Sequence, residues 1–132
     1  MRIKEIPNED FLFRNFNLKL LTITRGYSID EVPINAFRDV KGDGISTGWN
    51  KYCSAKKLRR LAKERKFNGV IKSNVGDIRK IIPLNVRHNP TMVNYGHSLI
   101  IGLPKKRDEK LKIRSLLKDI SEWVIPINMD FI

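Results

Sequence analysis

The sequence has few residues that could cross-link the chain or hold a metal ion. It contains one cysteine, Cys53, and two histidines among 132 residues. A single cysteine excludes an internal disulfide and every cysteine-rich zinc module. Because thiols stay reduced inside the cell, this usage favours the cytoplasm as the compartment.

Long hydrophobic runs are also absent. The longest, such as residues 98–103, span only a few positions, whereas a membrane helix needs about 20 apolar residues. Residues 1–7 lack the apolar stretch of a secretory signal peptide. The 41% hydrophobic content is nevertheless ordinary for a folded chain. The length fits one domain over residues 1–132.

Cofactor and metal motifs are missing as well. The turn at residues 42–44 has two glycines around Asp43, but no Gly-Lys-Ser/Thr follows, so it is not a phosphate-binding loop. Asp39 and Asp43 lack the further oxygen ligands and the terminal Glu of a calcium-binding loop. The spacing of the two histidines matches no common zinc site. We therefore predict no cofactor and no metal.

Acidic residues are scarce in the middle of the chain, which concentrates the net charge of +12 there. Residues 1–50 carry seven basic and seven acidic groups, and residues 51–80 carry eleven basic and two acidic groups. Residues 81–132 contribute eight basic and five acidic groups. Most of the excess thus lies in one short segment, which favours an anionic partner.

This basic segment is predicted to form a helix over residues 54–67. Ser54 is suited to cap its first turn, and an Asn-Gly pair at 68–69 to end it. A narrow apolar stripe at helical spacing faces inward. The opposite face carries Lys56, Lys57, Arg59, Arg60, Lys63 and Lys66.

We interpret this face as a nucleic-acid-binding surface, of either DNA or RNA, that contacts phosphates. Tyr52 precedes it and is a candidate for stacking on an exposed base, whereas Trp49 is expected in the core. One alternative is an adaptor that binds an acidic protein surface. Another is a solvated helix whose charges pair with Asp30, Glu31 or Asp39.

A second hypothesis makes the protein an enzyme. His88 and His97 sit at the two ends of a polar loop between expected strands, and Arg87 stands beside them. Two imidazoles that meet across the loop mouth can act as acid and base in metal-independent phosphodiester cleavage. The alternative is that both rings are structural. Other possible nucleophiles are Ser46, Thr47 and Cys53, but no neighbouring motif activates them.

The expected fold class is α+β, with a short mixed or antiparallel sheet packed against two main helices. The second helix is predicted over residues 107–124, because apolar residues recur there at three- and four-residue spacing. Strands are expected at 16–24, 45–49, 70–73, 81–88 and 97–103, with a capped helical turn at 75–80.

Overall fold

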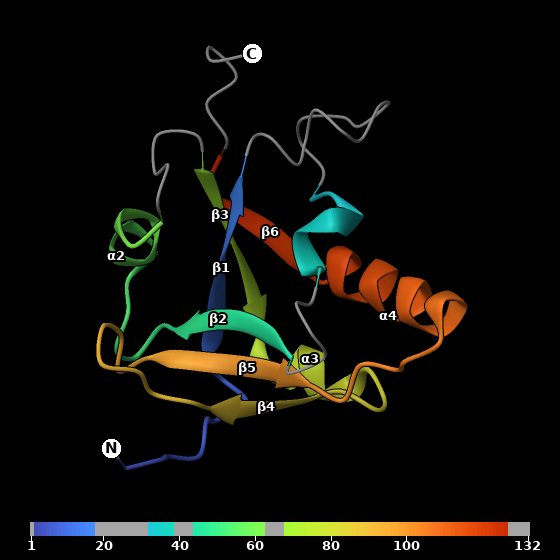
Figure 1. Ribbon diagram of the computed structural model, residues 1–132, viewed down its shortest axis with the longest axis horizontal. Helices are drawn as coiled ribbons and strands as arrows, with labels where there is room; N and C mark the ends of the chain where they lie inside the picture. The colour runs from blue at the N-terminus through green and yellow to red at the C-terminus, as the bar shows by residue number, and fades with distance from the viewer. Residues whose placement is uncertain (1, 18–31, 39–43, 63–67, 127–132) are drawn as a thin grey trace.

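The computed structural model describes residues 2–17, 32–38, 44–62 and 68–126 (Figure 1). They build one six-stranded sheet with the strand order β4-β5-β2-β1-β3-β6, in which every neighbouring pair is antiparallel. This confirms the α+β class and shows a larger sheet than predicted. The strands are β1 (Phe11–Asn17), β2 (Ile45–Trp49), β3 (Asn68–Asn74), β4 (Asn85–His88), β5 (His97–Ile101) and β6 (Ser121–Ile125).

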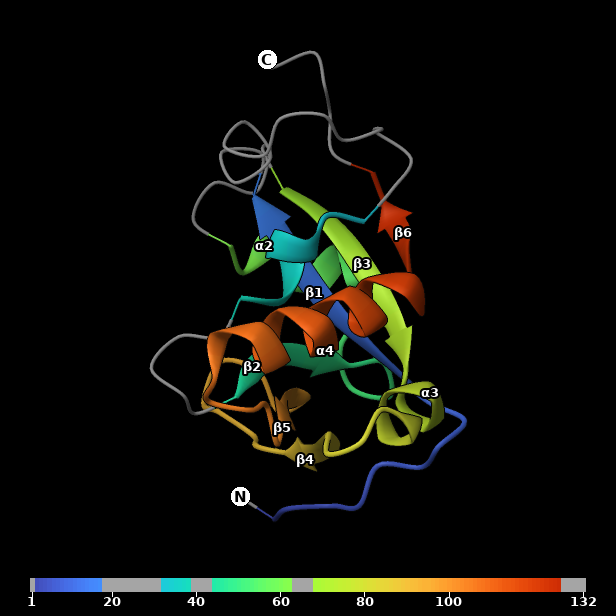
Figure 2. The same ribbon diagram turned by 90° about the vertical axis from the view of Figure 1, so that its right-hand side faces the viewer.

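Alternate residues along the strands supply two cores on opposite faces of the sheet. On β1, Leu12 belongs to the larger core and Phe13 packs against the smaller one. Helix α4 (Arg107–Asp119) and the 3₁₀ helix η1 (Ile34–Phe37) cover the larger core. Helix α2 (Ala55–Arg60) covers the smaller core on the other face, as Figures 1 and 2 show.

Helix α2 begins where the sequence predicts and is capped as expected. The Ser54 side chain accepts a hydrogen bond from the Lys57 amide at 3.1 Å. Within the described residues the helix ends at Arg60, with Leu61 as its C-cap. The second half of the predicted helix, including Lys63 and Lys66, lies outside the described residues.

The prediction of a single helix over residues 107–124 is wrong at its end. Helix α4 stops at Asp119, and residues 121–125 form β6 beside β3. Along β6 exposure alternates with a period of two, so Trp123 packs inward and Val124 is exposed. β-Branched and aromatic side chains suit a strand, and strand pairing overrides the helical spacing of the apolar residues. The short helix α3 (Val75–Lys80) begins after Asn74, its predicted cap.

The strand at 45–49 is confirmed, and the one expected at 70–73 lies within β3. The strands expected at 97–103 and 81–88 are shorter than predicted, because β5 ends at Ile101 and β4 begins only at Asn85, after Pro83. Strand β4 lies at an edge of the sheet. The expected strand at 16–24 is described only at its start, where Phe16 and Asn17 end β1. In the parts of the chain that the structure describes, no helix has the length and apolarity to cross a membrane.

Candidate functional site

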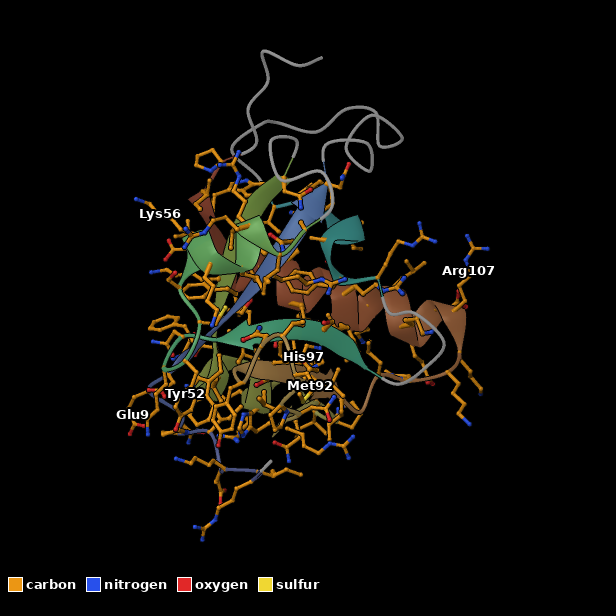
Figure 3. The ribbon with its side chains drawn as sticks, turned by 60° about the vertical axis from the view of Figure 1, so that its left-hand side comes forward. Glu9, Tyr52, Lys56, Met92, His97 and Arg107 are labelled. Atoms are coloured by element: carbon orange, nitrogen blue, oxygen red, sulfur yellow. The ribbon has the colours of Figure 1, made fainter. Side chains whose placement is uncertain are left out.

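Three basic side chains of α2 line one pocket of about 350 Å³, on the face of the sheet that carries the smaller core. These are Lys56, Arg59 and Arg60, and Ile125 of β6 completes the lining. Lys56 and Arg60 are exposed, whereas the Arg59 Nε donates a hydrogen bond to the Asn68 carbonyl at 3.0 Å. Figure 3 shows Lys56 projecting outward from the helix. The pocket is therefore lined by one apolar side chain and three basic ones.

The charges of α2 lack carboxylate partners in the described part of the chain. The two ion pairs found there join Lys72 to Glu122 and Lys80 to Asp77, and neither includes a residue of α2. The proposed acidic partners Asp30, Glu31 and Asp39 lie outside the described residues. Like charges three or four residues apart on one helix repel by a few tenths of a kcal/mol per pair. An anion bound in the pocket would relieve that repulsion.

Tyr52, the predicted base-stacking residue, is part of an aromatic cluster. Its ring stacks on His88 with a centroid distance of 6.2 Å and meets Trp49 and Tyr95 edge-on. Its hydroxyl accepts a hydrogen bond from the Lys4 ammonium at 2.9 Å. Three aromatic side chains thus contact the Tyr52 ring, and Tyr52 is only partly exposed to solvent. Trp49 is in the core, as the sequence predicts.

The contact between Lys4 and Tyr52 shifts the pKa of both groups. The hydrogen bond from Lys4 lowers the pKa of Tyr52, and the same bond raises the pKa of Lys4. A depressed pKa of Tyr52 adds stability above the unfolded tyrosine value of about 10, and this is lost as the pH falls through the folded value. The raised pKa of Lys4 adds stability below the unfolded lysine value of about 10.4, and this is lost as the pH rises through the folded value.

We expect a near-ultraviolet titration of the native protein to show a phenolate signal from Tyr52 below the usual pH range of tyrosine ionisation. Lys4→Met removes the donor, so the early phenolate signal should move to higher pH. Arg2→Met, a neighbouring loss of charge without a hydrogen bond to Tyr52, is the matched control. An early signal that persists in Lys4→Met would contradict the assignment.

His88 is buried beneath this cluster, with 1% of its surface exposed. Its Nδ1 accepts a hydrogen bond from the Lys4 backbone amide at 3.0 Å, and its Nε2 lies 2.6 Å from the Tyr95 carbonyl. A carbonyl only accepts, so Nε2 carries the proton of a neutral ring. Both nitrogens are therefore occupied by backbone partners, and neither is left to exchange a proton with a substrate.

The structure does not bring His88 and His97 together. Strands β4 and β5 pair antiparallel with His88 opposite Ser98, so His88 and His97 project from opposite faces of the sheet. His97 is half-buried on the face away from the larger core. There its Nε2 lies 2.7 Å from the Ser46 Oγ, and its Nδ1 lies 2.8 Å from the Asn89 carbonyl oxygen.

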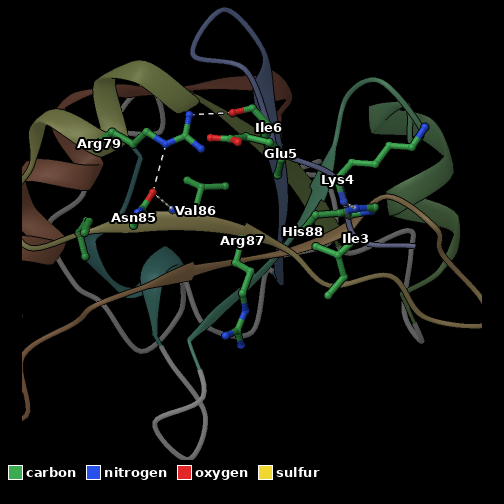
Figure 4. Close-up of a pocket in the computed structure, with 10 residues that line it drawn as sticks. Ile3, Lys4, Glu5, Ile6, Arg79, Asn85, Val86, Arg87 and His88 are labelled. Carbon is green, nitrogen blue, oxygen red and sulfur yellow. Dashed lines mark hydrogen bonds between the residues drawn. The ribbon is translucent and has the colours of Figure 1, made fainter. Parts of the chain in front are cut away.

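Arg87 lines a second cavity, of about 540 Å³, between the N-terminal segment and the edge strand β4 (Figure 4). Arg79, on the same cavity, is held by the Ile6 carbonyl at 2.7 Å and the Asn85 side chain at 3.1 Å. Figure 4 shows the Arg87 side chain extending to the opposite side of the β4 ribbon from Val86. Arg87 therefore belongs with the face that carries His97.

Of the other possible nucleophiles, Thr47 and Cys53 are buried, whereas Ser46 is exposed. Cys53 is 2% exposed, and burial raises the pKa of its thiol despite the nearby Lys57. Thr47 is also buried, and its hydroxyl donates to the Ser98 carbonyl at 2.9 Å. Among the described residues, no group of three or more His, Cys, Asp or Glu side chains is placed to hold a metal ion.

Sequence reasoning missed the contact between Ser46 and His97, and it missed Ile125 in the pocket of α2. Both depend on pairing between strands far apart in the sequence, which no local pattern reports. No family model matches the chain, and neither the curated proteins nor the solved structures include a match to it.

Proposed function

We propose that the protein binds nucleic acid through the cationic face of α2. The observation that supports this most is the pocket of about 350 Å³, in which Lys56, Arg59 and Arg60 converge without a carboxylate partner in the described ranges. Phosphate oxygens accept hydrogen bonds from both lysine and arginine. Such contacts give affinity and position the protein, but they read no base sequence.

Two further features favour a polymer over a single small anion. Lys57 extends the cationic surface along α2, and the exposed Lys51 lies near the Trp49 and Tyr52 rings at the preceding turn. The cationic side chains in this part of the chain thus extend beyond the three that line the pocket. The Asn15 side chain donates to the Leu58 carbonyl at 2.9 Å, which holds the helix on the sheet.

Salt dependence is the first measurement. Each phosphate neutralised on a duplex contributes about −0.9 to the slope of log K against log salt concentration. Four contacts from α2 predict a slope near −3.6, so affinity should fall about 150-fold between about 50 and 200 mM salt. Fluorescence anisotropy with a labelled mixed-sequence DNA duplex and a single-stranded RNA measures this. A flat salt dependence with both probes would overturn the proposal.

The double variant Lys56→Glu/Arg60→Glu tests the surface itself. Both side chains are exposed and neither holds the fold together, so thermal stability should change little while affinity falls at least about 10-fold and the salt slope at least halves. The matched control is Lys105→Glu/Arg107→Glu, an equal charge change at exposed positions near the start of α4, on the opposite side of the molecule from Lys56 (Figure 3).

If the two double variants weaken binding equally, the effect belongs to net charge and α2 is not the binding surface. An acidic protein partner is the competing outcome. It would show as wild-type protein that binds a polyglutamate probe at physiological salt but neither nucleic-acid probe.

A further inference from the structure

We infer that Ser46 and His97 form a nucleophile and general-base pair that hydrolyses a carboxylic ester carrying a negative charge. The inference starts from one contact between adjacent strands. Ser46 lies on β2 and His97 on β5, and their Oγ and Nε2 atoms are 2.7 Å apart. This is the distance of a direct hydrogen bond between a nucleophile and its base.

The partners of the ring determine its tautomer. The Asn89 backbone carbonyl lies 2.8 Å from Nδ1 and can only accept, so Nδ1 carries the proton. The side-chain amide nitrogen of Asn89, Nδ2, lies farther from Nδ1 of His97, at 3.4 Å. Nε2 is then the unprotonated nitrogen, and it accepts the Ser46 hydroxyl proton. The carbonyl orients the imidazole, which is the role of the third member in a catalytic triad.

The two side chains reach solvent. Ser46 is exposed and His97 is half-buried. Gly48 pairs with His97 and packs tightly against α2, where an added Cβ would lie 3.2 Å from both Cys53 and Leu58. His97 therefore lies next to the part of the sheet that α2 covers.

Arg87 indicates the charge of the substrate. Arg87 is exposed, and from its position on β4 it pairs with Leu99 of β5. On the other side of β5, Ser46 of β2 pairs with the same Leu99. Directly paired residues project to one face, and neighbouring strands are about 4.8 Å apart. The guanidinium therefore projects from the same face as the nucleophile, two strands away, where it can bind a carboxylate by a forked hydrogen bond.

The reaction balances with water as the only co-reactant. The Ser46 Oγ attacks the ester carbonyl carbon while its proton passes to Nε2 of His97. The carbon–oxygen bond to the alcohol then breaks, and the alcohol leaves with that proton. Water attacks the acyl-serine, gives its proton to Nε2, and the acid is released as Ser46 recovers its hydrogen.

A fluorophosphonate probe tests the pair, because serine attack on phosphorus expels fluoride and leaves a stable adduct. We expect intact-mass and peptide analysis to place one adduct on Ser46 of the folded protein. The adduct should be absent in Ser46→Ala and form at least about 100-fold more slowly in His97→Gln. Ser115→Ala, which removes an exposed serine on α4, should label like the wild type. Labelling must also disappear in denaturant.

Two ester probes test the substrate class. Arg87→Gln should slow hydrolysis of 4-nitrophenyl succinate about 10-fold and leave that of 4-nitrophenyl acetate unchanged. Equal effects on both esters would overturn the anionic preference. Wild-type protein without an adduct on Ser46 would overturn the nucleophile. Lys56→Glu/Arg60→Glu should label normally, so the test is independent of nucleic-acid binding.

Discussion

Trp49→Ala should lower the free energy of unfolding by about 3–5 kcal/mol, the largest loss that we expect from a single substitution. Trp49 is 1% exposed and is among the largest fully buried side chains. Its Nε1 donates to the Asp10 carboxylate at 2.7 Å, and its ring meets Tyr52 and His88 edge-on at centroid distances of 5.0 and 5.1 Å. The substitution removes packing, a hydrogen bond and two aromatic contacts together.

Urea unfolding followed by far-ultraviolet circular dichroism measures this loss without relying on the mutated fluorophore. Two phenylalanine variants separate its causes. Trp49→Phe leaves Asp10 without its donor, whereas Trp123→Phe removes an indole nitrogen that has no hydrogen-bond partner among the described residues. We expect Trp49→Phe to cost at least about 1 kcal/mol more than Trp123→Phe. Equal costs would mean that the bond to Asp10 adds no net stability.

His88→Ala should destabilise the fold by about 2–4 kcal/mol, because it leaves a cavity and two unpaired backbone groups. These groups are the Lys4 amide and the Tyr95 carbonyl, which the ring joins across long stretches of sequence. The N-terminal segment should also loosen, since the Lys4 backbone amide loses its acceptor, the Nδ1 of His88. Hydrogen exchange at the Lys4 amide is a direct readout of that loss.

His97→Ala is the matched control for His88. His97 is half-buried and bonded to one exposed side chain and to one backbone carbonyl, so we expect a cost of less than about 1 kcal/mol. The two histidines should thus differ severalfold in their effect on stability. Comparable losses would show that His97 is as structural as His88.

Local chemistry accounts for what could be predicted from the sequence. Ser54 and Asn74 cap helices where a cap was expected, because a side-chain oxygen satisfies a free amide regardless of the rest of the fold. Strand β5 was also predicted, because it is short, apolar and bounded by turn residues. The basic face of α2 follows from the spacing of its lysines and arginines alone.

The rest depends on contacts between distant segments. The apolar spacing of residues 120–124 suits a helix, but pairing with β3 makes them a strand. The enzymatic hypothesis requires the two histidines to meet, and their positions at the two ends of one loop allow it. Their separation follows from the register, in which His88 opposes Ser98 and alternation sends His97 to the other face. A shift of one residue in that register would place the two histidine side chains on the same face of the sheet.

The strand order has a consequence for how the described strands can fold while the chain is being synthesised. The first strand, β1, lies inside the sheet, with β2 on one side and β3 on the other. The β4–β5 hairpin then joins β2, and β6 joins β3. Each newly made unit can therefore dock on an edge that already exists, and no finished pair has to open to admit it. A ribosome-bound chain can build this sheet outward from its oldest strand as it emerges.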